Sequence, residues 1–538
     1  MKITSTNKKL LSVVFVLWLV IGLTVFNFAF AQSNQQDETV DTYRKLRLFT
    51  EVFNRLRQSY IYEIDVDKTI DAAIKGMLEE FDVHTHFFLP DEFDDFRTGT
   101  HGEFGGLGIS IDQQGDYITV ISPIEGTPAY KMGILAGDRI VRVDDENVVG
   151  VNTNEAIKLM RGDVGTEVKI TIERPGVERE LEFLIVRDLI EIKAIPYAFK
   201  MDNGIGYIRI RQFNANTSKE LREALDELEE EGIRGLLIDL RFNPGGLLNE
   251  AIDTVNEFVG KDKKVVFTKG RIPQVNQEFY TRYDRIRTGY PIIVMINEAS
   301  ASASEIFAGS MQDWDKGLVV GKTSFGKGSV QQLFPLQDGY GVKITTSKYY
   351  IHSGRGIHKD ETDRLIRGEE ISEEEMEEIE QKRLENIYYT ENGRIVYGGG
   401  GITPDIEIEQ DKMTPFQIEI RRRNLLFPFS IDYIVENNGE FSEEFVVTDE
   451  IINDFLSYAE EQGVSFTPEE VEESYEWLSI SLRSNIISRK LGDKAGYIVG
   501  LELDKQLQEA LEIFDEFPTL NEMFIYAEAL KAEEDTDQ

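Results

Sequence analysis

Near the middle of the chain, a stretch of the sequence reads Gly235-Leu236-Leu237-Ile238-Asp239-Leu240-Arg241-Phe242-Asn243-Pro244-Gly245-Gly246. Its first half is a nearly continuous apolar run, which is typical of a strand in a sheet that is covered on both faces. A proline and two glycines follow and predict a tight turn at the end of that strand. Two further buried strands are expected at Ile292–Ile296 and Leu318–Val320, and helical segments alternate with the strands. This alternation predicts an α/β domain.

A serine-rich loop follows the second of these strands. It reads Ala301-Ser302-Ala303-Ser304-Glu305-Ile306 and leads into a helix expected to start near Ala303. Small side chains at a sharp turn leave a hydroxyl exposed and the first N–H groups of the helix unpaired, which suits a nucleophile and half of an oxyanion hole. A structural alternative stays open, because Ser302 and Glu305 also match a capping box.

A lysine-bearing loop follows the third strand, with the sequence Gly321-Lys322-Thr323-Ser324-Phe325-Gly326-Lys327-Gly328. It approaches the pattern of a phosphate-binding loop, but Gly328 stands where that pattern requires serine or threonine. The three loops would converge, because the carboxyl ends of strands in an open α/β sheet share one crevice. A lysine in a desolvated pocket can be neutral at about pH 7 and deprotonate a serine hydroxyl, so Ser302 and Lys327 together predict a Ser–Lys catalyst.

The composition of the 538 residues suits such a catalyst. The chain has no cysteine, which excludes disulfides, thiolate metal sites and cysteine nucleophiles. It has five histidines, and a Ser–Lys mechanism needs none of them. With 58 basic and 98 acidic residues the net charge is −40, which argues against a nucleic-acid partner because phosphate binding needs a positive surface. We expect no cofactor and no metal.

Residues 102–187 show short strands and turns, in a layout that resembles a PDZ domain. The carboxylate-binding loop of that family matches Gly106-Leu107-Gly108-Ile109 here. Glycines let the backbone fold into a nest whose N–H groups receive the terminal carboxylate of a peptide, which would then add as a strand beside residues 109–111. A glycine-rich hairpin without a ligand is the structural alternative.

Over about residues 40–410 the chain resembles the C-terminal processing peptidases, which are tail-specific serine proteases with a built-in PDZ domain. The resemblance rests on three motifs in the family's order, namely Asp239–Gly246, Ala301–Ile306 and Phe325–Gly328. It implies a serine endopeptidase that selects its substrates by their C-terminal tails. A catalytically silent PDZ scaffold and a P-loop NTPase are the weaker alternatives.

The resemblance also implies roles for individual residues. Ser302 would be the nucleophile and Lys327 the general base, and the amide of Gln331, four residues further on, would orient the lysine.

The oxyanion hole that the resemblance implies is made of backbone N–H groups, those of Ala303 and of Gly245 or Gly246. For the two serines that flank the nucleophile, Ser300 and Ser304, we expect structural roles in the turn and the helix start.

The chain departs from the family pattern at two places. Phe81-Asp82-Val83-His84-Thr85 replaces the Leu-Asp-Pro-His-Ser type of stretch that the family often has. For the pair His84 and His86 we predict a structural turn, with a metal site as the alternative. An acidic insertion at residues 359–385, with 12 acidic and five basic residues, separates two segments that are close together in simpler members.

The N-terminus predicts export. Lysines at positions 2, 8 and 9 precede an apolar run at residues 10–30 that ends in Ala29-Phe30-Ala31. This pattern is typical of a secretory signal that is cleaved after Ala31, but the run is also long enough to remain as a membrane anchor. Both interpretations place the rest of the chain outside the cytoplasm, in the periplasm or cell envelope, and a buried soluble helix is the remaining alternative.

These features divide the chain into five parts. They are a signal or anchor at 1–31, a helical N-terminal segment at 38–98, a PDZ domain at 102–187, an α/β Ser–Lys protease core at 188–410 and an acidic helical C-terminal appendage at 411–538. The appendage holds 30 acidic and ten basic residues, so much of the negative charge lies outside the catalytic motifs. The expected partners are protein or peptide substrates with accessible C-terminal tails.

Overall fold

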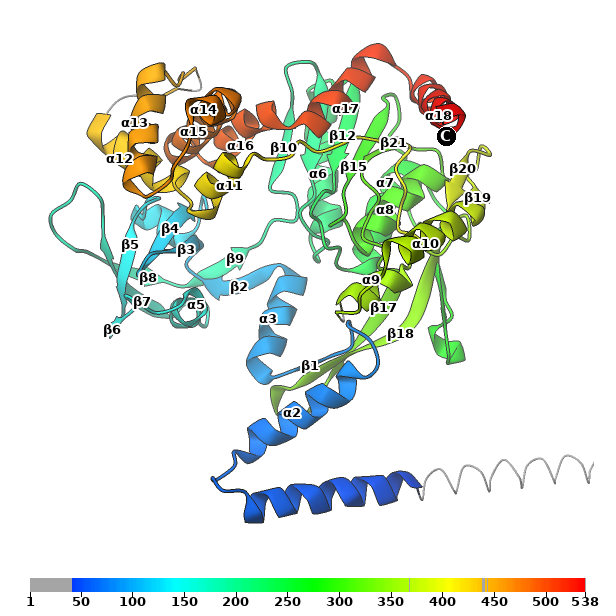
Figure 1. The fold of residues 1–538 in the computed structure, drawn as a ribbon, viewed down its shortest axis with the longest axis horizontal. Coiled ribbons are helices and arrows are strands. Elements are labelled where there is room, and N and C mark those ends of the chain that lie inside the picture. The colour runs from blue at the N-terminus through cyan, green and yellow to red at the C-terminus, as the bar shows by residue number, and fades with distance from the viewer. Residues whose placement is uncertain (1–40, 367, 438–440, 443, 538) are drawn as a thin grey trace, which may run out of the picture. The chain divides into compact units, whose positions relative to one another are not determined.

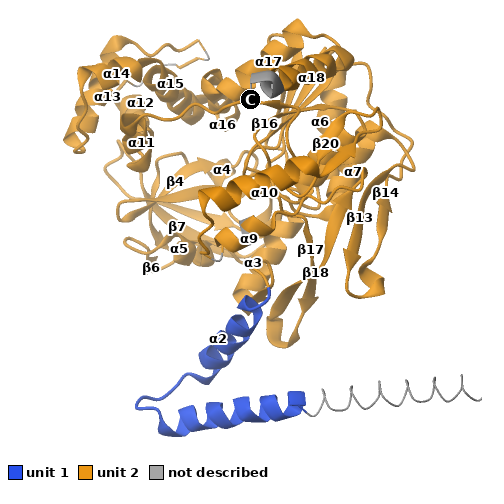
Figure 2. Ribbon diagram, turned by 45° about the vertical axis from the view of Figure 1, so that its right-hand side comes forward, with its two compact units in different colours: residues 1–81 blue, residues 82–538 orange. Residues whose placement is uncertain are grey.

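The computed structural model describes residues 41–366, 368–437, 441–442 and 444–537. The predicted signal or anchor at residues 1–31 lies outside them. Among the described residues, no helix combines the length and the apolar character that a membrane span requires. The chain forms two compact units that divide after Phe81 (Figure 2).

In the first unit, the described residues 41–81 contain two helices, one over residues 41–59 and α2 (Val66–Glu79). The predicted helical segment 38–98 does not end with them. Its last part belongs to the second unit and holds a short strand, β1 (His86–Phe88), before helix α3 (Pro90–His101). The sequence pattern missed β1 because three residues are too few to show the alternation of a strand.

A six-stranded sheet forms the centre of the second unit, and the predicted α/β class is confirmed (Figure 1). Its strand order is β10-β11-β12-β15-β16-β21, and all neighbours are parallel except β10 and β11. The strands are β10 (Tyr197–Lys200), β11 (Ile205–Arg209), β12 (Gly235–Asp239), β15 (Ile292–Ile296), β16 (Leu318–Gly321) and β21 (Ile406–Glu407).

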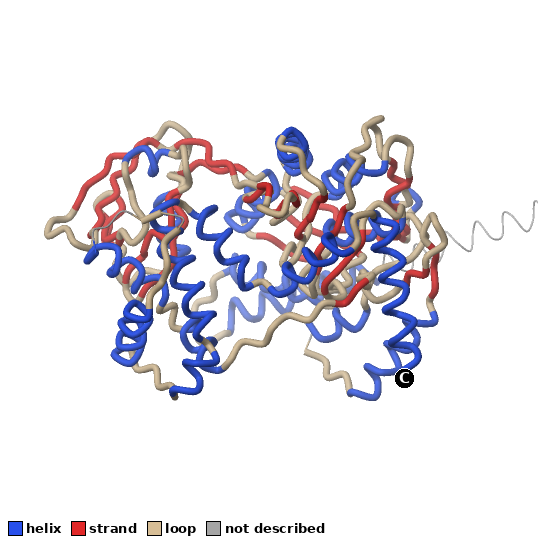
Figure 3. Tube along the Cα trace, turned by 90° about the horizontal axis from the view of Figure 1, so that it is seen from above, coloured by secondary structure: helices blue, strands red, loops and turns tan. Residues whose placement is uncertain are grey.

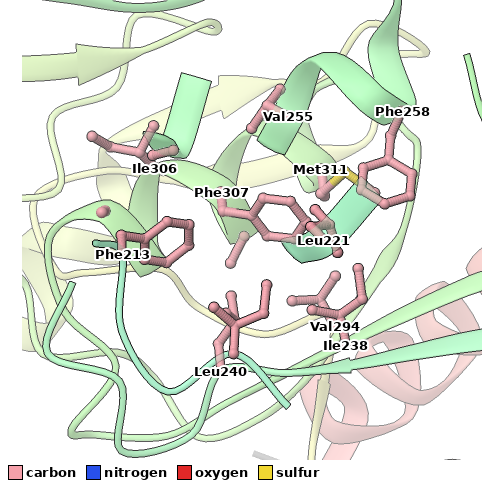
Figure 4. Packing of buried hydrophobic residues seen from close by; sticks show 14 of the residues in the cluster. Phe213, Leu221, Ile238, Leu240, Val255, Phe258, Val294, Ile306, Phe307 and Met311 are labelled. Carbon is pink, nitrogen blue, oxygen red and sulfur yellow. The ribbon is translucent and has the colours of Figure 1, made fainter. Parts of the chain in front are cut away.

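One face of this sheet is covered by α6 (Thr217–Glu230), α7 (Leu248–Val259) and α8 (Ala303–Asp313). Ile238 and Val294 from the strands pack there against Leu221 and Phe307 from the helices (Figure 4). Every residue of α8 is buried, so the helix that follows Ser302 is held rigidly.

The other face is covered by the C-terminal helices α17 (Lys505–Glu516) and α18 (Leu520–Asp537). Leu237, next to Ile238 on β12, points to this side and belongs to the same cluster as Phe514 of α17. Figure 3 shows helices on both sides of the strands. The sequence predicted an appendage here, but the structure builds this half of the C-terminal region into the protease core. The reason is that an uninterrupted apolar strand exposes apolar side chains on both faces of the sheet, and both need a cover.

The first half of the C-terminal region forms a helical subdomain with a core of its own, which includes Phe455 and Leu482. It contacts the PDZ domain, where Arg489 Nη1 donates to the carbonyl oxygen of Ile121 over 2.9 Å. Its helices are α11 (Pro415–Arg422), α12 (Leu426–Asn437), α13 (Asp449–Glu461), α14 (Pro468–Glu473), α15 (Tyr475–Leu491) and α16 (Asp493–Gly500).

The PDZ domain is a separate antiparallel sheet in the order β3-β4-β5-β7-β8, with the short β6 (Glu146–Asn147) beside β5. Strand β3 lies at its edge, and the helices of the domain are α4 (Pro128–Met132) and α5 (Thr153–Met160). Just before it, β2 (Glu103–Gly106) pairs with β9 (Asp188–Glu191). The main strands are β3 (Ile109–Gln114), β4 (Tyr117–Pro123), β5 (Arg139–Val143), β7 (Glu167–Glu173) and β8 (Leu181–Val186).

A third sheet carries the residues that follow the lysine loop. In it the long strand β18 (Gly341–Ile351) pairs with β1, β13 (Lys264–Gly270) and β17 (Ser329–Pro335), and β14 (Glu278–Tyr280) pairs with β13. The acidic insertion that follows β18 forms α9 (Asp360–Ile366) and α10 (Glu373–Glu385), and the hairpin β19 (Ile387–Tyr389) and β20 (Ile395–Tyr397) comes next.

Candidate active site

One cavity of about 840 Å³ collects the residues that the sequence predicted for catalysis. They come from the loops after β12, β15 and β16, whose carboxyl ends lie at the same edge of the parallel sheet. The predicted residues that line the cavity are Ser302, Lys327, Gln331, Ala303, Gly245 and Gly246.

Ser302 sits in a strained turn between β15 and α8. Its φ of 55° and ψ of −111° are unusual for a residue with a side chain, and such strain is found at functional sites. Its neighbours hold the turn, since the Ser300 hydroxyl donates to the Leu240 carbonyl over 2.9 Å and the Ser304 hydroxyl to the Asn243 carbonyl over 3.0 Å. Both flanking serines therefore have the structural roles that we expected.

The glycine loop after β12 packs directly against this turn. A Cβ on Gly245 would lie 2.7 Å from the Cβ of Ser302, and one on Gly246 would lie 2.0 Å from the Phe213 carbonyl oxygen. The Gly245 N–H donates to Asn243 Oδ1 over 2.9 Å, whereas within the described part of the chain the Gly246 and Ala303 N–H groups have no acceptor. Of the two glycines that the sequence left open, Gly246 is thus the one with a free donor.

The lysine loop is built for close packing and not for binding phosphate. A Cβ on Gly328 would lie 2.7 Å from the backbone nitrogen of His358, and one on Gly326 would lie 2.4 Å from the Lys359 side chain. A phosphate-binding loop needs free N–H groups, but those of Gly326 and Lys327 already donate to a carboxylate. The P-loop alternative therefore fails on geometry as well as on sequence.

The PDZ domain has a smaller cavity of about 160 Å³, and the four residues predicted to bind a peptide, Gly106, Leu107, Gly108 and Ile109, line it together with Met160. It lies beside β3, whose free edge can accept a further strand.

Helix α3 lines the catalytic cavity and forms ion pairs with the PDZ domain. Its Asp95 lines the catalytic cavity and pairs with Arg161, which lines the PDZ cavity, over 2.5 Å. A second ion pair of the same helix joins Asp91 to Lys158 of α5 over 2.9 Å.

Comparison with known proteins matches three family models to the chain. They are peptidase family S41 at residues 204–366, a PDZ domain at 119–174 and a family of unknown function, DUF8443, at 416–492. The carboxy-terminal-processing protease of Bartonella bacilliformis is 40% identical over 331 residues, which are 61% of this chain and 76% of that protein. The carboxy-terminal processing protease CtpA of Bacillus subtilis is 34% identical over 316 residues, 59% of this chain and 67% of that protein.

The chain belongs to peptidase family S41. The predicted resemblance is thereby confirmed, and the protein is a serine peptidase with a PDZ domain. Among solved structures, the photosystem II D1 C-terminal processing protease is similar at 24% identity, covering 67% of this chain and 92% of that one, with a TM-score of 0.35.

A buried carboxylate links the nucleophile turn of this S41 peptidase to its lysine loop. Glu305 Oε2 accepts hydrogen bonds from the N–H groups of Ser302 (2.7 Å) and Lys327 (3.0 Å). Its Oε1 accepts from the Gly326 N–H (2.7 Å) and the Ser324 hydroxyl (2.5 Å). Burial raises the pKa of Glu305, and these four hydrogen bonds counteract the rise. The capping-box pattern in the sequence predicted the hydrogen bond between Glu305 and the Ser302 N–H. The other three hydrogen bonds of Glu305 form only because the tertiary fold brings the lysine loop to it.

A tyrosine that the sequence analysis did not find also connects the nucleophile turn to the lysine loop, through backbone carbonyl groups. The Tyr349 hydroxyl lies 3.0 Å from the Ser302 carbonyl oxygen and 2.7 Å from that of Lys327. It has one proton, so it donates to one of the two at a time. Burial raises the pKa of Tyr349 well above its usual value, so the hydroxyl keeps its proton.

Gln331 is connected to the turn that replaces the family's Leu-Asp-Pro-His-Ser stretch. Its Nε2 donates to Ser329 Oγ over 2.9 Å and lies 3.4 Å from Thr345 Oγ1, which in turn donates to Asp82 Oδ1 over 3.1 Å. Asp82 Oδ1 also accepts from the His84 N–H over 2.8 Å, so this stretch is the structural turn that we predicted. Among the described residues, no group of three metal-ligating side chains exists.

Further residues of the cavity were not found by the sequence analysis. Its apolar side chains include Leu248, Val275, Phe279, Ile306 and Val330. Lys343 of β18 also lines the cavity, with its ammonium over the rings of Phe88 and Phe96, and burial lowers its pKa.

We expect Glu305→Gln to lower both stability and activity. In either orientation the amide NH₂ group would face backbone N–H groups that now donate to the carboxylate. Each buried N–H that loses its acceptor costs about 1–3 kcal/mol, and the two loops would no longer be held together. Thermal unfolding and a peptidase assay measure the two effects.

Glu220→Gln is the matched control. Glu220 of α6 also accepts a buried backbone N–H, that of Ile195 over 2.8 Å, and burial also raises its pKa, but it does not line the cavity. We expect this variant to lose stability and keep its activity per folded molecule. Wild-type activity per folded molecule in Glu305→Gln would contradict the role assigned to Glu305.

Proposed function

We propose that this S41 peptidase is an exported endopeptidase that binds the C-terminal tail of a protein at its PDZ groove and cleaves a peptide bond upstream with Ser302 and Lys327. The observation that carries the proposal is the meeting of three distant loops in one cavity, where a strained serine lies beside two N–H groups that have no acceptor among the described residues.

The first chemical step joins the serine to the substrate. The neutral amine of Lys327 takes the proton from Ser302 Oγ as this oxygen attacks the carbonyl carbon of the peptide bond. The carbonyl oxygen becomes an oxyanion, which accepts hydrogen bonds from the N–H groups of Ala303 and Gly246. Such donors stabilise the charge that develops in the transition state, and their positions are set before the substrate arrives.

The remaining steps release the products and restore the enzyme. The Lys327 ammonium gives its proton to the leaving amine as the C–N bond breaks, and an acyl-enzyme on Ser302 remains. A water molecule then attacks the carbonyl carbon of the ester and gives a proton to Lys327. The bond to Ser302 Oγ breaks, the Lys327 ammonium returns the proton to that oxygen, and the new C-terminus leaves as a carboxylic acid that ionises in water. The Gln331 amide, held through Thr345, orients Lys327 in both steps. The apolar side chains that line the cavity suit an apolar substrate side chain.

Export is part of the proposal and rests on the sequence of residues 1–31. We expect the mature protein to begin at Gln32, because the small residues Ala29 and Ala31 mark a cleavage site. N-terminal sequencing of the protein from fractionated cells tests this. A membrane fraction that retains residues 1–31 would indicate the anchor instead, and a cytoplasmic full-length chain would contradict export.

Two substitutions test the catalytic pair. We expect Ser302→Ala and Lys327→Ala each to lower the cleavage of an unfolded protein by at least about 10³-fold, since each removes a group that forms or breaks bonds. Circular dichroism and thermal unfolding show whether the fold is kept. Ser302→Ala that still cleaves at the wild-type rate would overturn the proposal. A wild type that binds tail peptides but never cleaves would indicate the PDZ scaffold.

A substrate with a blocked tail tests the PDZ groove. We expect amidation of the C-terminal carboxylate to raise KM about tenfold, because the amide loses the charge that the glycine-rich nest receives. The kcat should change little, because the tail lies away from the scissile bond. Equal KM values for the free and amidated substrates would show that the groove does not select tails.

A further inference from the structure

The C-terminal region places a charged side chain against the loop that carries Gly246. Arg241 follows β12 by two residues, and its side chain is only 7% exposed. Its Nη1 donates to Asp504 Oδ1 over 2.8 Å and its Nη2 to Asp504 Oδ2 over 2.5 Å, which is a bidentate pair. Gln506 Oε1 also accepts from Nη1 over 3.1 Å. Two residues at the start of α17 thus bind the Arg241 guanidinium.

The same guanidinium binds Asp239 at the end of β12, with 2.8 Å between Arg241 Nη2 and Asp239 Oδ2. Arg209 completes the cluster, at 2.6 Å from Asp239 Oδ1, so two carboxylates balance two guanidinium groups. Burial alone would raise the pKa of Asp239, but Arg241 and Arg209 hold it below its usual value. Without Asp504 the cluster would keep a buried positive charge in excess, which is costly.

This cluster lies at one end of the glycine loop, and the nucleophile turn lies at the other. The Arg241 N–H donates to Asp239 Oδ1 over 2.9 Å, and Arg209 Nη2 donates to the Arg241 carbonyl over 2.5 Å. Two residues on, the Asn243 carbonyl accepts from the Ala301 N–H over 2.9 Å. Arg241 and the nucleophile turn are thus linked through the backbone of the loop that carries Gly246.

The partners of Arg241 are themselves fixed in place. Asp504 is the N-cap of α17 and accepts from the Leu507 N–H over 3.1 Å. Gln506 is buried and its Nε2 donates to the Ile408 carbonyl over 2.8 Å. Helix α17 in turn is packed on the sheet through Phe514. Arg241 is thus held by a rigid helix and not by a mobile surface side chain.

We propose that Asp504, assisted by Gln506, is a positioning residue for the oxyanion hole, so that the C-terminal region works as part of the catalytic machinery. The proposal rests on the proposed function, because it takes the Gly246 N–H as an oxyanion donor. Asp504 lies outside the residues matched by the S41 and PDZ models and beyond those matched by the family of unknown function.

The chain offers a matched control at the other end of the same helix. Arg234, just before β12, forms an ion pair with Asp515 near the end of α17. Both ion pairs thus join α17 to the flanks of β12, but only the Asp504 pair lies at the end that carries the catalytic loop. A change that merely loosens α17 would act through either pair.

The test compares Asp504→Asn with Asp515→Asn in the full-length protein. Asparagine keeps the N-cap of α17 and removes the charge that faces Arg241. We expect Asp504→Asn to lower kcat about tenfold or more with KM within about twofold, because a displaced donor weakens only transition-state binding. The affinity for a peptide boronate, which forms a tetrahedral adduct with the serine, should fall by a similar factor, while tail-peptide binding should stay unchanged. Asp515→Asn should match the wild type in all three measurements.

The outcomes separate positioning from stability. Assays are run below the lowest Tm, and rates are given per folded molecule. Wild-type kcat and boronate affinity in Asp504→Asn would overturn the proposal even if its Tm falls, and so would an equal loss in Asp515→Asn. If Asp504→Asn does not fold, Gln506→Met tests the proposal in its place. We expect this variant to lower kcat about threefold and to leave KM unchanged. Ser302→Ala is included, since cleavage by this variant would contradict the proposed function and not the role of Asp504.

Discussion

Four hydrogen bonds converge on the buried carboxylate of Glu305, and the arrangement of the site depends on them. Two of the donors belong to Ser302 and Lys327, which lie on different loops. A buried carboxylate is tolerated only when such donors surround it, so neither loop can move without leaving it unsatisfied. Tyr349 repeats the connection on the carbonyl side of the same two residues. The serine and the lysine are thus held in place through their backbone groups.

The three catalytic loops extend from a central sheet that is covered by helices on both faces. Helices α6, α7 and α8 cover one face, and α17 and α18 cover the other. The C-terminal region therefore contributes to the protease core, and its acidic character reflects its outer surface. Its contact with Arg241 extends this contribution to the glycine loop. The C-terminal region is far from the catalytic motifs in the sequence, but its helix α17 lies next to the glycine loop in the fold.

The PDZ domain is attached to the rest of its unit from two sides. Helix α3 pairs with it through Asp91 and Asp95, and the C-terminal helices contact it through Arg489. Asp95 also lines the catalytic cavity. A tail bound at the PDZ groove therefore lies on a domain that is joined by direct contacts to the elements around Ser302.

Local patterns in the sequence determined the α/β class, the PDZ layout and the pairing of Ser302 with Lys327 as candidates. Apolar runs, glycine turns and motif spacing are properties of short segments, so they can be found without a structure. Three features follow from the folded structure instead: among the described residues the Gly246 N–H has no acceptor, Glu305 accepts hydrogen bonds from two loops, and Asp504 binds Arg241. Each of these depends on contacts between residues far apart in the chain, about which spacing within a motif carries no information.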